Sequence, residues 1–304
     1  MTTVRALNSP TDAEKRKQAR SIWTDSFIRF LKDRLSVIAT IGLVIILFAC
    51  YLGPVIVENV YDVDPNSTNL AASYTQPNSE NLLGTDAYGR DQLIRLLYGG
   101  RVSLAIAVTT SMFSISFGLF MGLAAGYFGG WVDSFIMWFI TTLNAIPSLM
   151  LLILLAAVLT PSVSTLIFSL TLISWTTTMR LVRGETLSHR SREYVLSAEA
   201  IGARPLRIMY VQILPNVFSV FIVALALQVG TLILVEAALS FLGLGVRPPT
   251  PSWGNMLTEA QRYFRQGPHL SILPGLMIVA TVLSLYLIGD GLRDAFDPQA
   301  SKKK

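Results

Sequence analysis

The sequence has little charge, one cysteine and two histidines, and each shortage excludes a class of protein. Only 14% of its 304 residues are charged, whereas soluble domains carry about 25%. The single cysteine, Cys50, excludes an intrachain disulfide, and the two distant histidines, His189 and His269, do not form a metal site. The sequence also lacks a G-x-x-x-x-G-K-[ST] phosphate-binding loop and any Ser/His/Asp or Cys/His arrangement. We therefore expect a chain without a catalytic centre, a bound cofactor or a metal.

Apolar residues are instead concentrated in long runs that contain no charge. An α-helix rises about 1.5 Å per residue, so about 20 apolar residues cross a hydrocarbon core of about 30 Å. The runs are Leu35–Val57, Val102–Trp131, Ser134–Met179, Ile208–Val235 and Leu270–Gly289. The run 134–179 is too long for one span, and Thr160-Pro161-Ser162 supplies a turn that divides it. We predict an all-α membrane protein with six transmembrane helices.

The positions of Lys and Arg indicate which helix ends face the cytoplasm. With the N-terminus inside, the cytoplasmic segments 1–34, 127–133, 180–210 and 291–304 hold 18 of the 24 basic residues. Cytoplasmic loops of membrane proteins carry such an excess. We expect both termini to be cytoplasmic, and we attribute the net charge of +5 to this topology, with no nucleic-acid site.

This topology divides the chain into five parts. Residues 1–34 are expected to form a cytoplasmic segment, without a cleaved signal peptide, and 35–57 the first transmembrane helix. Residues 58–101 form an external segment, 102–290 a core of five helices with an external loop at 240–269, and 291–304 a cytoplasmic tail.

A polar island at 180–213 separates two of the hydrophobic runs. Arg192–Ile201 is predicted to form a helix with an apolar face composed of Tyr194, Val195, Ala198 and Ile201. Gly202 ends this helix, and Pro205 is well placed to open a second short helix that runs to about Ile213. The island would either rest on lipid headgroups as an amphipathic helix or form a hairpin that a partner protein contacts at its small-residue corner.

The segment Leu196–Gly202, followed by Leu214-Pro215, resembles the EAA loop of ABC importer permeases, although Leu196 stands where that motif usually has Glu. In that family the loop forms a coupling helix that docks into a groove on the ATPase subunit. The resemblance implies that the hairpin 192–213 makes this contact. The residues expected to take part are Glu193, Tyr194, Ala198, Glu199, Gly202, Ala203, Leu214 and Pro215.

Two outer segments narrow the resemblance. LGTDAYGRD at 83–91, continuing to GRVSL at 100–104, looks like the signature of the dipeptide, oligopeptide and nickel permease group. LSFLGLG at 239–245 with PPTPSWG at 248–254 is similar to another loop of that group. The chain most resembles the C-type permease subunit of peptide importers. An external gate or binding-protein contact would then involve Gly84, Thr85, Asp86, Gly89, Arg90, Asp91 and Trp253.

The spacing of apolar residues after 91 predicts a structure independently of the family resemblance. Three leucines, Leu93, Leu96 and Leu97, share one helix face, which predicts an amphipathic helix lying flat on the outer membrane surface. Asp91 and Arg95 would form an ion pair one turn apart on that helix. A surface helix and a gate are both compatible with this sequence.

Two features of the predicted spans suggest specific roles. Gly118, Gly122 and Gly126 recur every four residues, which predicts close packing against another helix. Glu236 is the only acid well within a predicted span, and such residues are expensive in a membrane. It would be a satisfied structural or pathway-lining residue, or else a proton relay, in which case the chain would be a proton-coupled secondary transporter.

The resemblance implies a type I ABC importer permease-like subunit in the bacterial or archaeal cell (inner) membrane. Its cargo would be dipeptides or oligopeptides, with nickel complexes, glutathione and oligosaccharides as alternatives. The expected partners are a second homologous permease subunit, two ABC ATPase subunits that bind ATP and Mg, an external substrate-binding protein and the lipid bilayer.

Overall fold

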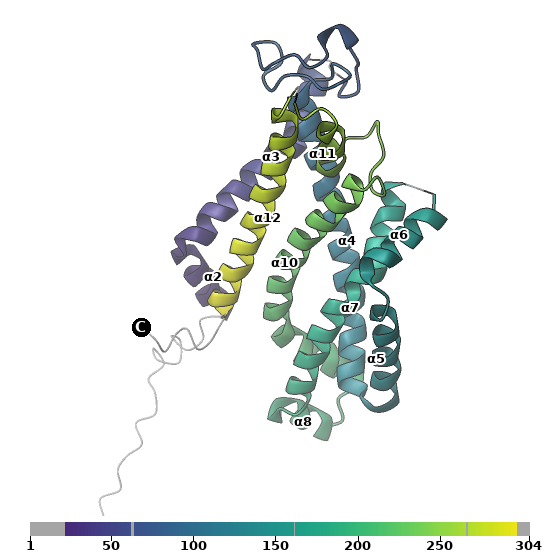
Figure 1. Cartoon of the computed structure of the whole chain (residues 1–304). Coiled ribbons are helices and arrows are strands. Elements are labelled where there is room, and N and C mark those ends of the chain that lie inside the picture. The colour runs from purple at the N-terminus through teal and green to yellow at the C-terminus, as the bar shows by residue number, and fades with distance from the viewer. Residues whose placement is uncertain (1–21, 62–63, 161, 266, 297–304) are drawn as a thin grey trace, which may run out of the picture.

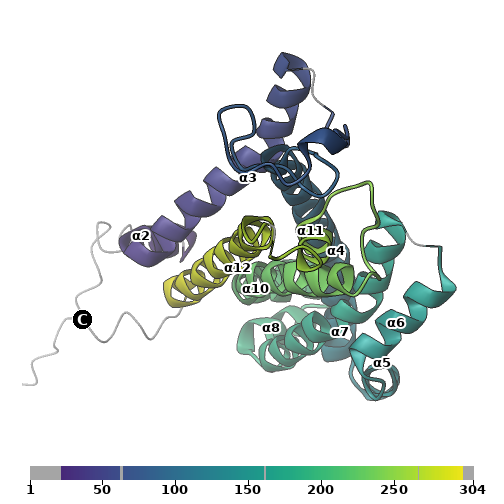
Figure 2. The ribbon, with the colours of Figure 1, turned by 45° about the horizontal axis from the view of Figure 1, so that its top comes forward.

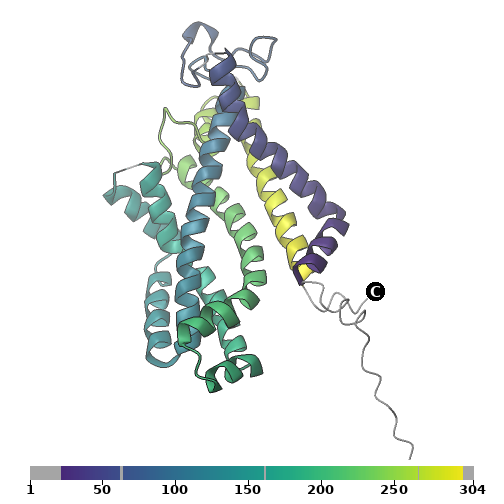
Figure 3. The same ribbon diagram turned by 180° about the vertical axis from the view of Figure 1, so that it is seen from behind.

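The computed structural model of the chain describes residues 22–61, 64–160, 162–265 and 267–296 (Figure 1). Most of the expected N-terminal segment, Pro161 of the expected turn and the end of the C-terminal tail lie outside the described residues. Within them, long helices run side by side between two ends of the molecule (Figures 1 and 3).

Five helices are long and apolar enough to cross a membrane, and a bent pair of shorter helices brings the number to six. The five are α3 (Arg34–Tyr61), α4 (Gln92–Phe128), α7 (Val163–Arg190), α10 (Leu214–Phe241) and α12 (His269–Phe296). The pair consists of α5 (Gly130–Asn144) and α6 (Ser148–Val158). The prediction of an all-α membrane protein with six spans is confirmed if the pair counts as one.

The break between α5 and α6 turns the chain by 80°. Pro147 immediately precedes α6. Proline lacks an N–H and disfavours helical geometry in the residue before it, so α5 ends upstream of this position. At the other end of α6, the turn expected near 160–162 separates it from α7, whose first turn is capped by the Ser162 hydroxyl accepting from Thr165 N–H at 3.1 Å.

The N-terminal segment contains a helix that the sequence analysis did not predict. α2 (Ile22–Lys32) precedes α3 and packs against α12, with Ser26 buried and Phe27 exposed. Asp33 separates the two helices and caps α3 by accepting from the backbone N–H of Ser36 at 3.2 Å. The Ser36 hydroxyl also donates to this carboxylate and lowers the pKa of Asp33.

The separate surface helix expected after residue 91 is not formed, and that prediction is wrong. Residues 92–101 are instead the first turns of the 37-residue helix α4. Asp91 does not pair with Arg95 but caps α4, its carboxylate accepting from Ile94 N–H at 3.0 Å. The leucine face packs inward because α3 and α11 (Trp253–Gln261) cover this end of α4.

The most extensive helix contact in the described chain joins α4 to α7. A Cβ added at Gly118 would lie 2.7 Å from Trp175 O, and one added at Gly122 would lie 2.7 Å from Met179 O. A Cβ at Gly126 would lie 2.6 Å from Thr186 Cβ. The three glycines thus face α7 at backbone distance. Nearer the other end of α4, Gly100 packs on Cys50, which is fully buried.

This packing predicts that a large side chain at one of these glycines destabilises the protein. Gly122→Leu would push α7 away, and overpacking of this kind costs about 1–3 kcal/mol or more. We expect a clearly lower melting temperature for the purified, detergent-solubilised chain. Gly184→Leu is the matched control, because Gly184 lies on α7 with open space around it. Equal melting temperatures for the two variants would contradict the assigned contact.

The two ends of the molecule differ. At one end, residues 64–91 with the short helix η1 (Leu70–Ala72), the loop 242–252 and α11 form a cap (Figures 1 and 2). We call it the outer cap because the sequence analysis expects these segments to be external. At the opposite end lies a hairpin of short elements that includes α8 (Glu193–Ala200).

Candidate functional site

The hairpin is built as the sequence predicts up to its corner. α8 ends at Ala200, and Gly202 follows with a φ of +80°, a conformation that favours glycine. Its N–H donates to Glu199 O at 2.9 Å, and the N–H of Ala203 donates to Ala198 O at 3.0 Å. These two bonds form a Schellman motif. The corner is therefore a defined turn.

After the corner the chain re-enters the membrane without a break. Pro205 opens the three-residue helix α9 (Pro205–Arg207), as predicted, and a π-helical turn, η2 (Ile208–Ile213), follows it directly. Leu214 and Pro215 then begin α10. The hairpin is thus continuous with α10 on one side and is separated from α7 by only two residues on the other.

One face of the hairpin is fixed to the transmembrane helices. Val195 and Ala198 are buried in an apolar cluster with residues of α4, α7 and α10. Tyr127 at the end of α4 donates its hydroxyl to Glu199 Oε1 at 3.0 Å. Nearby, Arg183 of α7 holds Asp133 of α5 through two bonds of 2.5 and 2.6 Å. The hairpin and the surrounding helix ends form one packed unit.

The opposite face of the hairpin presents apolar side chains. Ile201 is 86% exposed, Leu206 61% and Leu196 52%. The prediction that Ile201 shares a face with Val195 is wrong, because α8 ends before it and its backbone is no longer helical. Glu193 is exposed, and Tyr194, also exposed, is hydrogen-bonded through its hydroxyl to His189 Nδ1 at 2.8 Å. Exposed apolar side chains on this polar segment fit both expected contacts, with lipid headgroups and with a partner protein.

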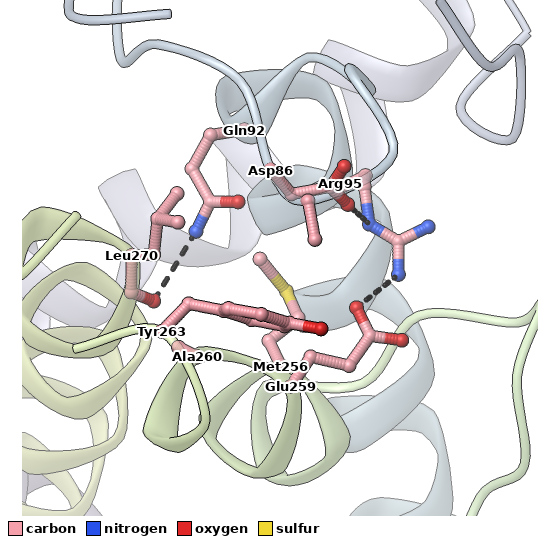
Figure 4. A pocket seen from close by; sticks show the side chains of 9 residues that line it. Asp86, Gln92, Arg95, Met256, Glu259, Ala260, Tyr263 and Leu270 are labelled. Carbon is pink, nitrogen blue, oxygen red and sulfur yellow. Dashed lines mark hydrogen bonds and ion pairs between the residues drawn. The ribbon is translucent and has the colours of Figure 1, made fainter. Parts of the chain in front are cut away.

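At the other end, four charged residues form a cluster in the outer cap, in which three are buried and Glu259 is partly exposed. Arg90 contacts Asp86 at 2.6 Å and Glu259 of α11 at 2.8 Å. Arg95, only 1% exposed, contacts the same two carboxylates at 3.4 and 3.5 Å (Figure 4). Removing one partner of such a buried group leaves an uncompensated charge. The cluster therefore fastens residues 64–91 to α11.

The other residues of the segment 83–91 stabilise the fold of the cap. Thr85 donates its hydroxyl to Ala72 O and accepts from Thr75 N–H at 2.9 Å. Gly84 and Gly89 have φ values of +75° and +71°, and a side chain at Gly89 would collide with the backbone of Asn69. Because Thr85, Asp86 and Arg90 are buried, they position the cap and do not form its outer surface in this conformation.

Glu236 is fully buried and joins three parts of the chain. Its carboxylate accepts from Ser103 of α4 at 2.9 Å and from Ser240 of α10 at 2.7 Å. The hydroxyl of Ser103 in turn accepts from the backbone N–H of Trp253 at 3.2 Å. Trp253 is also buried and donates its Nε1–H to Leu96 O at 3.0 Å. Glu236 thereby holds the start of α11 against the membrane helices.

Two cavities lie along α7 and α10, and Glu236 lines neither. The larger, with a volume of about 530 Å³, is bounded by α6, α7, α10 and the end of α5. The smaller, of about 430 Å³, is bounded by α7, α10 and α12. Leu181, Ala224 and Leu227 line both cavities, so the two are adjacent.

The sequence analysis missed several residues of these regions. Glu259 was not singled out. It lies in the expected external loop 240–269, where an acidic residue near several arginines could have suggested an ion pair. Gln228 was missed because an amide within a span carries no charge. It accepts from Thr178 Oγ1 at 3.0 Å and donates to Ser114 Oγ at 2.5 Å, and so joins α10 to α7 and α4.

The long apolar helices are typical of a multi-pass membrane protein. In comparisons with known proteins, the family described as the binding-protein-dependent transport system inner membrane component matches residues 114–302. The N-terminal TM domain of oligopeptide transport permease C matches residues 21–77.

Individual relatives are similar over nearly their whole length. A dipeptide transport system permease protein of Alkalihalophilus pseudofirmus is 35% identical, with 96% of this chain and 94% of the relative covered. A glutathione transport system permease protein of Pectobacterium atrosepticum is 37% identical, with 93% of each covered. An oligopeptide transport system permease protein of Bacillus subtilis is 35% identical, with 96% and 94% covered.

The chain therefore belongs to the family of inner-membrane components of binding-protein-dependent transport systems. It is a multi-pass permease subunit of an ABC importer, as the resemblance in its loops implied.

Proposed function

We propose that this chain forms half of the translocation pathway of an importer for dipeptides and oligopeptides, and that the hairpin couples it to ATP hydrolysis. The peptide cargo is supported by the dipeptide and oligopeptide permeases among its relatives. The coupling role is supported above all by the hairpin, whose apolar residues Leu196, Ile201 and Leu206 are exposed.

The proposed complex has four kinds of protein. This chain pairs with a second homologous permease subunit in the bilayer, and two ABC ATPase subunits bind the hairpins of the two permeases. An external substrate-binding protein delivers peptide to the outer cap. The chain itself binds no cofactor and catalyses no reaction, since ATP and Mg are bound by the ATPases. Both of its termini are cytoplasmic, on the side of the hairpin.

The connections of the hairpin suggest how movement is transmitted. η2 passes directly into α10, and α7 ends two residues before α8. α7 and α10 are also the helices that line both cavities. When the ATPases close around ATP, they displace the hairpin as a rigid unit with these helix ends, and the cavity walls move with it. Hydrolysis then restores the inward-facing arrangement.

Glutathione is a second candidate cargo because glutathione permeases of several bacteria are 37% identical to this chain. Glutathione is itself a short peptide, with two free carboxylates and one free amino group. The two candidates share this chain's role and differ only in the peptide that the binding protein delivers.

Affinity purification of the chain from its native membranes in mild detergent, followed by mass spectrometry, tests the complex. We expect a second six-span chain and two P-loop ATPases to co-purify. Uptake by membrane vesicles of radiolabelled dipeptides and of glutathione, with the co-purified binding protein present, then identifies the cargo. A chain that purifies alone and transports under a proton gradient would contradict the proposal.

A further inference from the structure

The wall of the larger cavity mixes polar and apolar side chains and includes no charged residue. Half of its lining residues carry hydroxyl or amide groups, and the rest are aliphatic. Such a wall is unusual between membrane helices, where an unsatisfied polar group is costly. In membrane proteins, polar groups that face neither lipid nor a tight helix contact line a path for water or solute.

Several of these groups are available to a solute. The hydroxyls of Ser148, Ser174 and Thr177 make no hydrogen bond within the part of the chain that the structure describes. They come from two elements on one side of the cavity, α6 and α7. Thr231 of α10 also lines the cavity and is exposed; its hydroxyl donates to Leu227 O at 3.0 Å and lies 3.3 Å from the hydroxyl of Tyr286.

The adjacent smaller cavity is charged but balanced. Its lining includes one acid and one base, Asp290 and Arg293, one turn apart on α12. The smaller cavity thus has one negative and one positive side chain, both from the last turns of α12. Neither cavity contributes a net charge to a solute that moves between them.

We infer that the larger cavity is this chain's share of the substrate path, and that its uncharged hydroxyl and amide wall lets peptides pass whatever the charge of their side chains. The inference rests on the proposed function. Hydroxyl and amide groups bond to the peptide backbone, which is common to all peptides. A fixed charge would favour the entry of a peptide of opposite sign and repel one of like sign, so the path would select peptides by charge.

The test introduces a charge of each sign at one wall position. The wild type, Thr231→Asp, Thr231→Lys and the near-isosteric Thr231→Val are assembled with their partner subunits in proteoliposomes. Uptake of Ala-Ala, Ala-Lys and Ala-Glu is measured at saturating binding protein. Each variant rate is divided by the wild-type rate for the same peptide, which removes the selectivity of the binding protein.

We expect the Ala-Lys to Ala-Glu ratio to change in opposite directions for Thr231→Asp and Thr231→Lys. The two variants should differ by about tenfold or more, because charges interact strongly in a partly desolvated path. Thr231→Val should change the uptake rates of all three peptides by the same factor. If one of the charged Thr231 variants fails to assemble, Ser174→Asp and Ser174→Lys on the facing helix α7 provide the same comparison.

The outcomes separate the inference from the function on which it rests. A wild type that imports none of the three peptides would overturn the proposed cargo and the inference together. If the wild type imports them and the charged variants at both positions slow all three equally, the path is elsewhere and only the inference is overturned.

Discussion

Replacement of Gly202 by tryptophan is expected to abolish transport and to uncouple the ATPases while the chain still inserts into the membrane. Gly202 lies at the corner of the hairpin, and no atom of the described chain lies within 4 Å of a Cβ placed there. The indole would therefore project outward, into the surface that we assign to the ATPase. Its backbone φ of +80° adds a strain of about 1–2 kcal/mol for a residue other than glycine.

Two further variants separate the loss of docking from the backbone strain. Gly202→Asn keeps the corner, because asparagine tolerates this conformation, and we expect it to retain most of the uptake. Ile201→Asp changes an 86% exposed side chain and so leaves the fold intact, yet places a charge in the proposed contact. Uptake and substrate-stimulated ATP hydrolysis are measured in the complete complex. Normal peptide uptake by Gly202→Trp would contradict the docking role of the hairpin.

A second large effect is expected at Glu236. Glu236→Ala removes the acceptor for the hydroxyls of Ser103 and Ser240 and leaves a buried space. Loss of a buried side chain of this size costs about 2–5 kcal/mol, and each unsatisfied buried group adds about 1–3 kcal/mol. Because Ser103 also holds Trp253, the start of α11 should loosen. We expect a much lower melting temperature and peptide uptake reduced by roughly tenfold or more.

Glu236→Gln is the informative partner of this variant. Its amide oxygen still accepts one of the two hydroxyl bonds, and the shape is unchanged, so a structural role predicts a loss of stability of about 1–3 kcal/mol and an uptake well above that of Glu236→Ala. A proton relay must titrate, and glutamine cannot. Complete loss of transport in Glu236→Gln, with normal thermal stability, would therefore favour the secondary-transport mechanism.

The hairpin could be predicted from the sequence because its structure is set locally. Gly202 and Pro205 end one helix and begin the next for reasons that need no tertiary contact. The direction of Ile201 could not be predicted in this way. Its exposure depends on the residue at which α8 ends, and a difference of one position turns the side chain from the buried face to the outer one.

The structure of the outer cap, in contrast, depends on tertiary contacts and could not be predicted from local sequence. The leucines before residue 101 have the spacing of a helix on the membrane surface, and the helix is present, but it continues into the second span without interruption. Its inner face is covered by α11, a segment more than 150 residues later in the chain. Likewise, Arg95 pairs with Glu259 instead of Asp91. Such pairings follow from tertiary packing, which a local pattern does not contain.

The burial of Cys50 makes this permease suitable for site-specific labelling. It is the chain's only cysteine, and its side chain has no exposed surface. Cysteines introduced together at Ile201 and Thr231 would therefore be the two thiols of this chain that a maleimide reagent can reach. Spin or fluorescent probes attached there would report the distance between the hairpin and the cavity wall through the ATP cycle, with no need to mutate the native thiol.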